Sequence, residues 1–438
     1  MVWYVRRHVA VVAMCLATDA LICLICLLVL VPAGFSLNPH ARPRSVDGQV
    51  SIFDSLDGEP VIDDVGRPVS SGQVDRADDG SDIAVEAPVV PSAPVADAVP
   101  VASHVVPVTL GTARDGLDPG LQEAYDAILV GYVNLEFPIY VSCDVDDARK
   151  AANAVLLDHP EIYWSDGTMS ISSSARDGRL AIRVDSVPDA ATVTRELSDM
   201  DSVVDSLVGS SAGGSEYDVA WSVYVNLAKW CSYDLAADDS QSMRSALVGR
   251  SSVCAGYARA FQYAMHRNGI RCGLVTGDFA GERHMWCVAC LDGEWCQIDP
   301  TWGDAERAGL ESGFDIAFVP DYFGMTDDDV VASGHVLEPG QSVPACSSRA
   351  NDPFERAGLV VDSRDQSRVS SLFWGQVDSG SVTMRFVGDD VRAWAMVGLA
   401  DGTLLGKEMS VLAEERGLVE FQYGTRTDKE LGILQIVV

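Results

Sequence analysis

The hydrophobic and polar positions divide the 438-residue chain into five stretches of different character. Residues 9–37 are almost continuously apolar, and residues 20–35 alone are nearly long enough to span a bilayer. Residues 38–118 show no sustained period and contain repeated proline, which keeps a chain extended. We therefore expect a signal peptide or membrane anchor over residues 1–37, followed by a disordered acidic linker over residues 38–118.

The apolar segment predicts export in either of two forms. Val31-Pro32-Ala33 has small residues at the two positions that a signal peptidase requires, so a cleaved signal and an uncleaved anchor are equal alternatives. Arg6-Arg7 precede the segment and Arg42 and Arg44 follow it, so its N-terminal position, more than its flanking charge, favours an N-terminus inside the cell. The rest of the chain is then anchored at the cell surface or secreted.

Three folded stretches are predicted after the linker. Residues 119–210 alternate helical spacing with short strand-like runs, which indicates a small α/β subdomain with a hairpin about Arg176-Asp177-Gly178. Residues 211–345 combine amphipathic helices with an alternating hairpin, so an α+β domain is expected there. Residues 350–438 alternate apolar and polar residues in short runs separated by turn signals, which is typical of an antiparallel β-sandwich or barrel.

Composition and charge narrow the classes of partner. The hydrophobic fraction of 47% is that of a globular protein, and the length allows two or three domains. The net charge of −33 repels phosphate groups, which argues against nucleic acid or anionic lipid as a partner.

Two patterns suggest a metal site, but neither has the right geometry. Residues 75–86 place acidic residues as a calcium loop does, yet Ala77 occupies the third position of the loop, where a ligand is needed, and no helices flank it. Cys287 and Cys290 have CxxC spacing, but residues three apart in a strand point to opposite faces. We expect buried thiols there and at Cys272 and Cys296, with disulfide pairing left open, and we expect neither a metal nor a cofactor.

Cys254 is predicted to lie in the first turn of a helix. Ser251 and Ser252 are good N-cap residues, apolar residues recur at helical spacing from Val253, and Asn268-Gly269 ends the helix. Unpaired N–H groups and the helix macrodipole favour the thiolate at such a position, and a thiolate is a nucleophile. Cys254 is therefore the candidate catalytic residue.

A histidine and an aspartate are predicted to accompany it. His266 lies on the same helix about 18 Å further along the axis, which is too far for a base. Asp292-Gly293 is a strong signal for a two-residue hairpin, and its register places Trp286 opposite Asp299, with His284 diagonal to Asp299 on the same face. His284 and Asp299 can therefore form a hydrogen bond, which completes a set of nucleophile, base and orienting residue.

These residues carry a resemblance to a known family. GRSSVCAGYARAF (residues 249–261) and GERHMWCVACLDGEWCQIDPTW (residues 281–302) resemble the core of the transglutaminase-like superfamily, which has a papain-type fold for cysteine acyl transfer. The resemblance implies that Cys254 is the nucleophile, that His284 is the general base and acid, and that Asp299 orients the imidazole. It is strong over residues 217–335 and thin elsewhere.

Other side chains near these motifs allow two interpretations. Trp286 shares the face of His284 and fits either a cleft wall or the hydrophobic core. Tyr257 and Trp302 lie within the matching motifs and are candidates for the substrate cleft. His335 follows a predicted capped helix and is interpreted as structural.

The predicted function is that of an exported cysteine enzyme that transfers or hydrolyses acyl groups of glutamine or peptide amides. One alternative is a cysteine peptidase or amidase acting on cell-wall or surface peptides. Another is a surface protein that binds wall material without catalysis, in which Cys254 is a buried small side chain and His284 a hydrogen-bonded core residue. A protein or peptide substrate and the membrane, through the N-terminal segment, are the expected partners.

Overall fold

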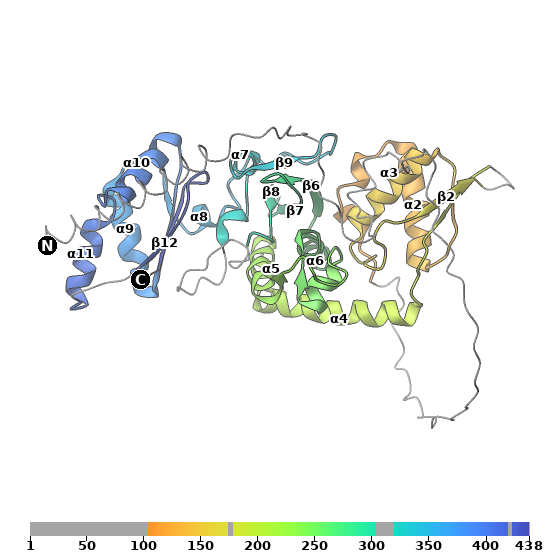
Figure 1. Ribbon diagram of the computed structural model, residues 1–438, viewed down its shortest axis with the longest axis horizontal. Coiled ribbons are helices and arrows are strands. Elements are labelled where there is room, and N and C mark those ends of the chain that lie inside the picture. Colours follow the sequence, from red (N-terminus) through yellow and green to blue (C-terminus); the bar gives the residue numbers. More distant parts are fainter. Residues whose placement is uncertain (1–103, 174–177, 304–318, 419–422, 438) are drawn as a thin grey trace, which may run out of the picture. The chain divides into compact units, whose positions relative to one another are not determined.

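The computed structural model describes residues 104–173, 178–303, 319–418 and 423–437 (Figure 1). By their contacts, these residues all belong to one unit of the chain. The predicted signal or anchor over residues 1–37 lies outside the described part. Within that part, no helix combines the length and the apolar character that a membrane crossing needs.

The first described residues correct the predicted linker, which does not extend to residue 118. Residues 104–118 form two short 3-10 helices, η2 (Val108–Leu110) and η3 (Arg114–Gly116). The successive backbone N–H groups of residues 112–114 donate to the buried carboxylate of Asp158. Such turns have no hydrophobic period, so the pattern did not reveal the order that this carboxylate imposes.

An N-terminal subdomain follows, with its own hydrophobic core. Its helices are α2 (Pro119–Asn134) and α3 (Val145–Asp158), and Asp144 caps α3 by accepting from Asp147 N–H. Its antiparallel sheet has the order β1-β3-β2, formed by Ile139–Val141, Leu180–Arg183 and Ser170–Ser173. The antiparallel pairing of β2 with β3 confirms the two strands of the predicted hairpin, and residues 174–177 of its predicted turn lie outside the described part.

The central domain is built around one buried helix. Helix α6 (Cys254–Arg267) is buried along all but its last residue, with strands β6 and β7 against it (Figure 1). The other helices and turns of the central domain are α4 (Ala190–Val208), η4 (Gly209–Ser211), α5 (Glu216–Trp230), the π-helical turn η5 (Ser245–Gly249), η6 (Pro320–Tyr322) and α7 (Asp327–Ala332).

Two sheets complete the central domain. The larger sheet has the order β8-β7-β6-β9 and is antiparallel, with strands Glu294–Ile298, Glu282–Leu291, Cys272–Phe279 and His335–Leu337. The smaller one pairs β4 (Ser232–Tyr233) with β5 (Ser251–Ser252). Together with the buried helix, these sheets make the α+β fold that was expected for this part of the chain.

The β7–β8 hairpin has the predicted register. Leu291 pairs with Glu294, and Cys287 pairs with Ile298. Asp292 and Gly293 have φ angles of 51° and 88°, as a type I′ turn requires. This local geometry brings His284 to the same end of the sheet as Asp299.

The predicted C-terminal β-sandwich or barrel is wrong. The C-terminal domain (residues 350–437) is α/β, with a mixed sheet of order β10-β11-β13-β12. Its elements are α8 (Pro353–Arg356), β10 (Val360–Val361), α9 (Gln366–Gln376), η7 (Val377–Ser379), β11 (Ser381–Phe386), α10 (Asp389–Ala400), α11 (Gly406–Glu415), β12 (Gly424–Asp428) and β13 (Ile433–Val437).

The error came from short runs that also fit a helical period. Val369, Leu372 and Phe373 are buried at positions i, i+3 and i+4 of α9. The Asp365 side chain accepts from two backbone N–H groups at the start of this helix, a cap that the alternating interpretation ignored.

Candidate active site

Cys254 is the first residue of α6, as predicted, but the serines before it do not cap the helix. The N-cap residue is Val253, and no side chain caps this end of α6. Ser251 and Ser252 form β5 instead, where Ser252 Oγ donates to the Ser240 carbonyl at 2.8 Å. Cys254 is 7% exposed, so its environment is largely dry but not sealed.

The residues after Cys254 fix the loop that packs on this helix start. A Cβ atom at Gly256 would lie 1.9 Å from Ser252 Oγ and 2.9 Å from the Ser240 carbonyl oxygen, so only glycine permits this close approach. Tyr257 was predicted to line the substrate cleft, but it is fully buried, and its hydroxyl donates to the Cys231 carbonyl at 2.6 Å. Tyr257 therefore anchors the end of α5 beneath the site.

His284 lies between the sulfur of Cys254 and the carboxylate of Asp299. Its Nε2 is 2.6 Å from Asp299 Oδ2, which is the contact expected from the hairpin register. Its remaining ring nitrogen is left for Cys254, with which His284 also forms a hydrogen bond. His284 and Asp299 are 6% and 0% exposed, so the carboxylate acts only through the imidazole.

Charge in this group favours an imidazolium. Burial alone would lower the pKa of His284, but Asp299 and the Cys254 sulfur outweigh burial and raise this pKa to about 10. Burial would likewise raise the pKa of the Asp299 carboxyl, but His284 and a second histidine hold it well below its usual range. The site is thus built to keep a proton on His284 at neutral pH.

The second histidine is His335, which was predicted to be merely structural. Its Nε2 lies 3.0 Å from Asp299 Oδ2, the same oxygen that contacts His284, and its Nδ1 lies 2.8 Å from Ser333 Oγ. The other carboxylate oxygen of Asp299 accepts from the Thr301 N–H at 3.0 Å. Asp299 is therefore held by His284, His335 and the Thr301 N–H. Local sequence patterns gave no signal that β9 would bring His335 to this carboxylate.

His284, Asp299 and His335 are also close enough to be considered as metal ligands, since one ligand atom from each lies within 4.8 Å of the others. The two Nε2 atoms, however, face one carboxylate oxygen at hydrogen-bond distance. Each nitrogen must carry a proton to make such a bond, and a protonated ring nitrogen cannot ligate a metal. Hydrogen bonding thus accounts for the cluster without a metal ion.

The two tryptophans predicted near the substrate cleft differ in exposure. Trp286 is fully buried, so it does not line an open cleft. Its ring is stacked on His284 at 6.0 Å, and its Nε1 donates to Gln297 Oε1 at 2.7 Å. Trp302 is half-buried and lies 4.7 Å from the Phe279 ring, which itself lies 5.7 Å from His284. Trp302 is the predicted cleft residue that retains a surface to offer a substrate.

The cysteines behave as the strand geometry predicts. Cys287 is fully buried, as expected, whereas Cys290, on the opposite face of β7, is only half-buried and so differs from the buried thiol that was expected. Each cysteine in the described part of the chain is a free thiol. The CxxC spacing therefore produces no shared site.

Comparisons with known proteins find one matching family and several similar solved structures. Residues 205–300 match the family described as the transglutaminase-like superfamily. Similar solved structures include a TGase crystal structure (16% identity, 55% of this chain and 66% of that chain, TM-score 0.25). Another is a putative cysteine protease from Cytophaga hutchinsonii (16% identity, 31% of this chain and 62% of that chain, TM-score 0.21). A third is the periplasmic domain of TgpA from Pseudomonas aeruginosa bound to ethylmercury (18% identity, 26% of this chain and 46% of that chain, TM-score 0.20).

The chain thus spans 66% or less of the length of each of these structures. The search of curated proteins found no match.

Proposed function

The chain belongs to the transglutaminase-like superfamily through residues 205–300, and from this premise we propose that it is a cysteine enzyme acting on the amides of glutamine side chains or peptides. The observation that carries the proposal is the contact sequence from Cys254 through His284 to Asp299. Its three members supply a nucleophile, a proton carrier and a group that orients the carrier.

In the proposed reaction, the Cys254 thiolate attacks the amide carbon and forms a C–S bond. The oxyanion accepts from the backbone N–H of Cys254, which lies at the uncapped N-terminus of α6. His284 gives its proton to the amide nitrogen as the C–N bond breaks, which releases ammonia or an amine and leaves a thioester. An incoming amine or water then loses a proton to His284, attacks the thioester and releases Cys254.

We place this chemistry outside the cell, at the surface or after secretion, because of the apolar segment predicted over residues 9–37. Proteins or peptides are the proposed substrates. The net charge of −33 favours substrates or amine donors that carry positive charge, since these are attracted to the protein.

The test is incubation of the full chain with a library of glutamine-containing peptides, with and without a primary amine, followed by mass analysis. Replacement of ammonia by the amine demonstrates transamidation, and conversion of glutamine to glutamate demonstrates hydrolysis. Chain cleavage identifies a peptidase or amidase instead. Peptide binding without any product, equal in the parent and Cys254→Ala proteins, would contradict catalysis and support a binding protein.

The proposal predicts an activity that persists to high pH. Because the pKa of His284 is raised to about 10, the imidazolium that protonates the leaving group survives until that pH, and kcat/KM should fall only above it. The pair also stabilises the fold fully below pH 6.5, the ordinary value for histidine, and this contribution is lost as the pH rises through about 10. Rate and unfolding measurements from pH 6 to 11 check both effects; a fall in kcat/KM centred near pH 7 would contradict them.

A further inference from the structure

Two arginines of the C-terminal domain reach segments that hold Asp299. Arg385 lies on β11 and Arg426 on β12, and their side chains are 6% and 12% exposed. Each pairs with an aspartate of the central domain, Asp329 and Asp321 respectively. A domain that only carried a binding surface would not need buried charge pairs with the catalytic domain.

The first route runs through Arg426. Both of its terminal nitrogens donate to Asp321, at 2.5 Å and 2.6 Å, and the Asp321 side chain is 0% exposed. The next residue, Tyr322, accepts the backbone N–H of Asp299 on its carbonyl oxygen at 2.8 Å. The arginine fork therefore fixes the turn η6, to which the backbone of Asp299 is bonded.

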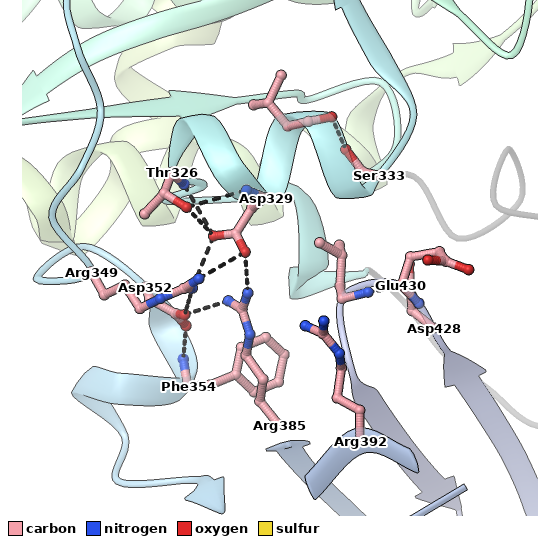
Figure 2. Close-up of polar contacts among 12 residues, drawn as sticks. Thr326, Asp329, Ser333, Arg349, Asp352, Phe354, Arg385, Arg392, Asp428 and Glu430 are labelled. Carbon is pink, nitrogen blue, oxygen red and sulfur yellow. Dashed lines mark hydrogen bonds and ion pairs between the residues drawn. The ribbon is translucent and has the colours of Figure 1, made fainter. Parts of the chain in front are cut away.

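The second route runs through Arg385. Its Nη2 donates to Asp329 Oδ1 at 2.5 Å, and its Nη1 donates to Asp352, as Figure 2 shows. Asp329 is the third residue of α7 and completes a capping box with Thr326. The arginine thus holds the helix start from the outside.

From α7 the contact continues to the active site. Ser333, which follows this helix, contacts His335 Nδ1 at 2.8 Å, and His335 Nε2 contacts Asp299 at 3.0 Å. The two routes reach the same residue, Asp299, one at its backbone N–H and one at its carboxylate. For Asp321 the charges explain the dependence, because this buried aspartate would carry an uncompensated charge without Arg426 and would have to move or take up a proton. Asp329 keeps a second partner, Arg349, at 2.9 Å and 3.0 Å, so Arg385 acts there by tying the helix start to the C-terminal domain.

We propose that Arg385 and Arg426 are positioning residues, through which the C-terminal domain sets the Asp299 carboxylate against His284. This inference rests on the proposed function of Cys254, His284 and Asp299. The C-terminal domain is then a working part of the catalytic unit.

The experiment measures alkylation of Cys254 by iodoacetamide against pH in the full chain, with peptide mass analysis to identify the labelled cysteine. Arg426→Gln, Arg426→Lys and Arg385→Lys are compared with the parent. Arg364→Gln is the matched control, because Arg364 is an exposed arginine of the same domain that pairs with the exposed Asp390 at 3.4 Å. Amide turnover is measured in parallel as kcat and KM.

A displaced Asp299 carboxylate should stabilise the imidazolium less, which lowers the pKa of His284. We expect Arg426→Gln to lower kcat and the neutral-pH alkylation rate about tenfold or more, with KM nearly unchanged. The high-pH limb of the profile should move down by about one pH unit or more. The two lysine variants keep the charge but lose the two-pronged contact, so they should fall between Arg426→Gln and the parent. Arg364→Gln should match the parent.

Unfolding curves are recorded for every variant. If Arg426→Gln does not fold, the lysine variants decide: a shifted high-pH limb in a folded lysine variant supports the proposal. Parent-like rates and profiles in the folded Arg426 and Arg385 variants would overturn it. Failure of the proposed function looks different, because Cys254 of the parent would then react no faster than an ordinary thiol and no amide would turn over.

Discussion

Replacing Cys254 by alanine is expected to lower the turnover of glutamine peptides by roughly a million-fold, which is the scale of loss when a catalytic nucleophile is removed. His284 and Asp299 cannot replace it, because neither carries the sulfur that forms the thioester. Peptide affinity should change little, since the thiol contributes its energy in the transition state. Ammonia release and peptide binding, measured on the same preparation, check the two expectations.

Cys290→Ala is the matched control for this prediction. Cys290 is a half-buried free thiol on β7, the strand that carries His284, but it lies six residues further along this strand, roughly 20 Å from His284. Its removal should leave turnover at the parent level. Turnover by Cys254→Ala within about a hundredfold of the parent would contradict a nucleophilic role for Cys254.

The contacts of the site that could be predicted from the sequence are those between residues that lie close together along the chain. His284 and Asp299 are fifteen residues apart and are brought together by one two-residue turn, whose type Asp292-Gly293 specifies. Strand alternation then decides the faces, so the register alone indicated the contact. Cys254 was predicted in the same way, because the start of a helix can be located from its apolar period and its end.

The part that could not be predicted depends on a pairing between distant segments. His335 enters the site because β9 pairs with β6, where Phe279 lies opposite His335. A Cβ atom at Gly277 would lie 2.1 Å from the Val336 carbonyl oxygen, so β9 can approach only because this position is glycine. In the sequence, Gly277 is one glycine inside a strand-like run, and nothing nearby indicates which segment will approach it.

The C-terminal domain shows how a pattern with two periods misleads. In the run from Val391 to Gly398, the buried residues are four and three apart, which is helical, although the run also alternates enough to suggest a strand. The flanking Asp389 and Asp390 at the start of this helix favour helix through the macrodipole. In such a run, acidic residues and caps at the start indicate a helix more reliably than a short alternation indicates a strand.

Asp299→Asn is expected to lower kcat by roughly ten-thousandfold while the chain still folds, the scale seen when the orienting aspartate of a catalytic triad is replaced by its amide. In the parent, Asp299 Oδ2 accepts from both His284 and His335, and Oδ1 accepts from the Thr301 N–H. An amide has one oxygen and one NH₂ group, so it must turn a donor toward either the two imidazoles or the Thr301 N–H.

If the NH₂ group faces the imidazoles, His284 can satisfy it only by giving up the proton on Nε2, and the remaining proton then points at Cys254. If the oxygen faces the imidazoles instead, the NH₂ group meets the Thr301 N–H, and two donors oppose each other. Both orientations lack the negative charge that helps raise the pKa of His284 in the parent. We therefore expect the high-pH limb of kcat/KM to move down from about 10 along with the loss in kcat. Asp292→Asn, in the exposed turn of the same hairpin, is the control that should change neither. An Asp299→Asn protein with a parent-like high-pH limb would show that this carboxylate does not govern the charge of His284, and the proposed proton transfer would then need another orienting group.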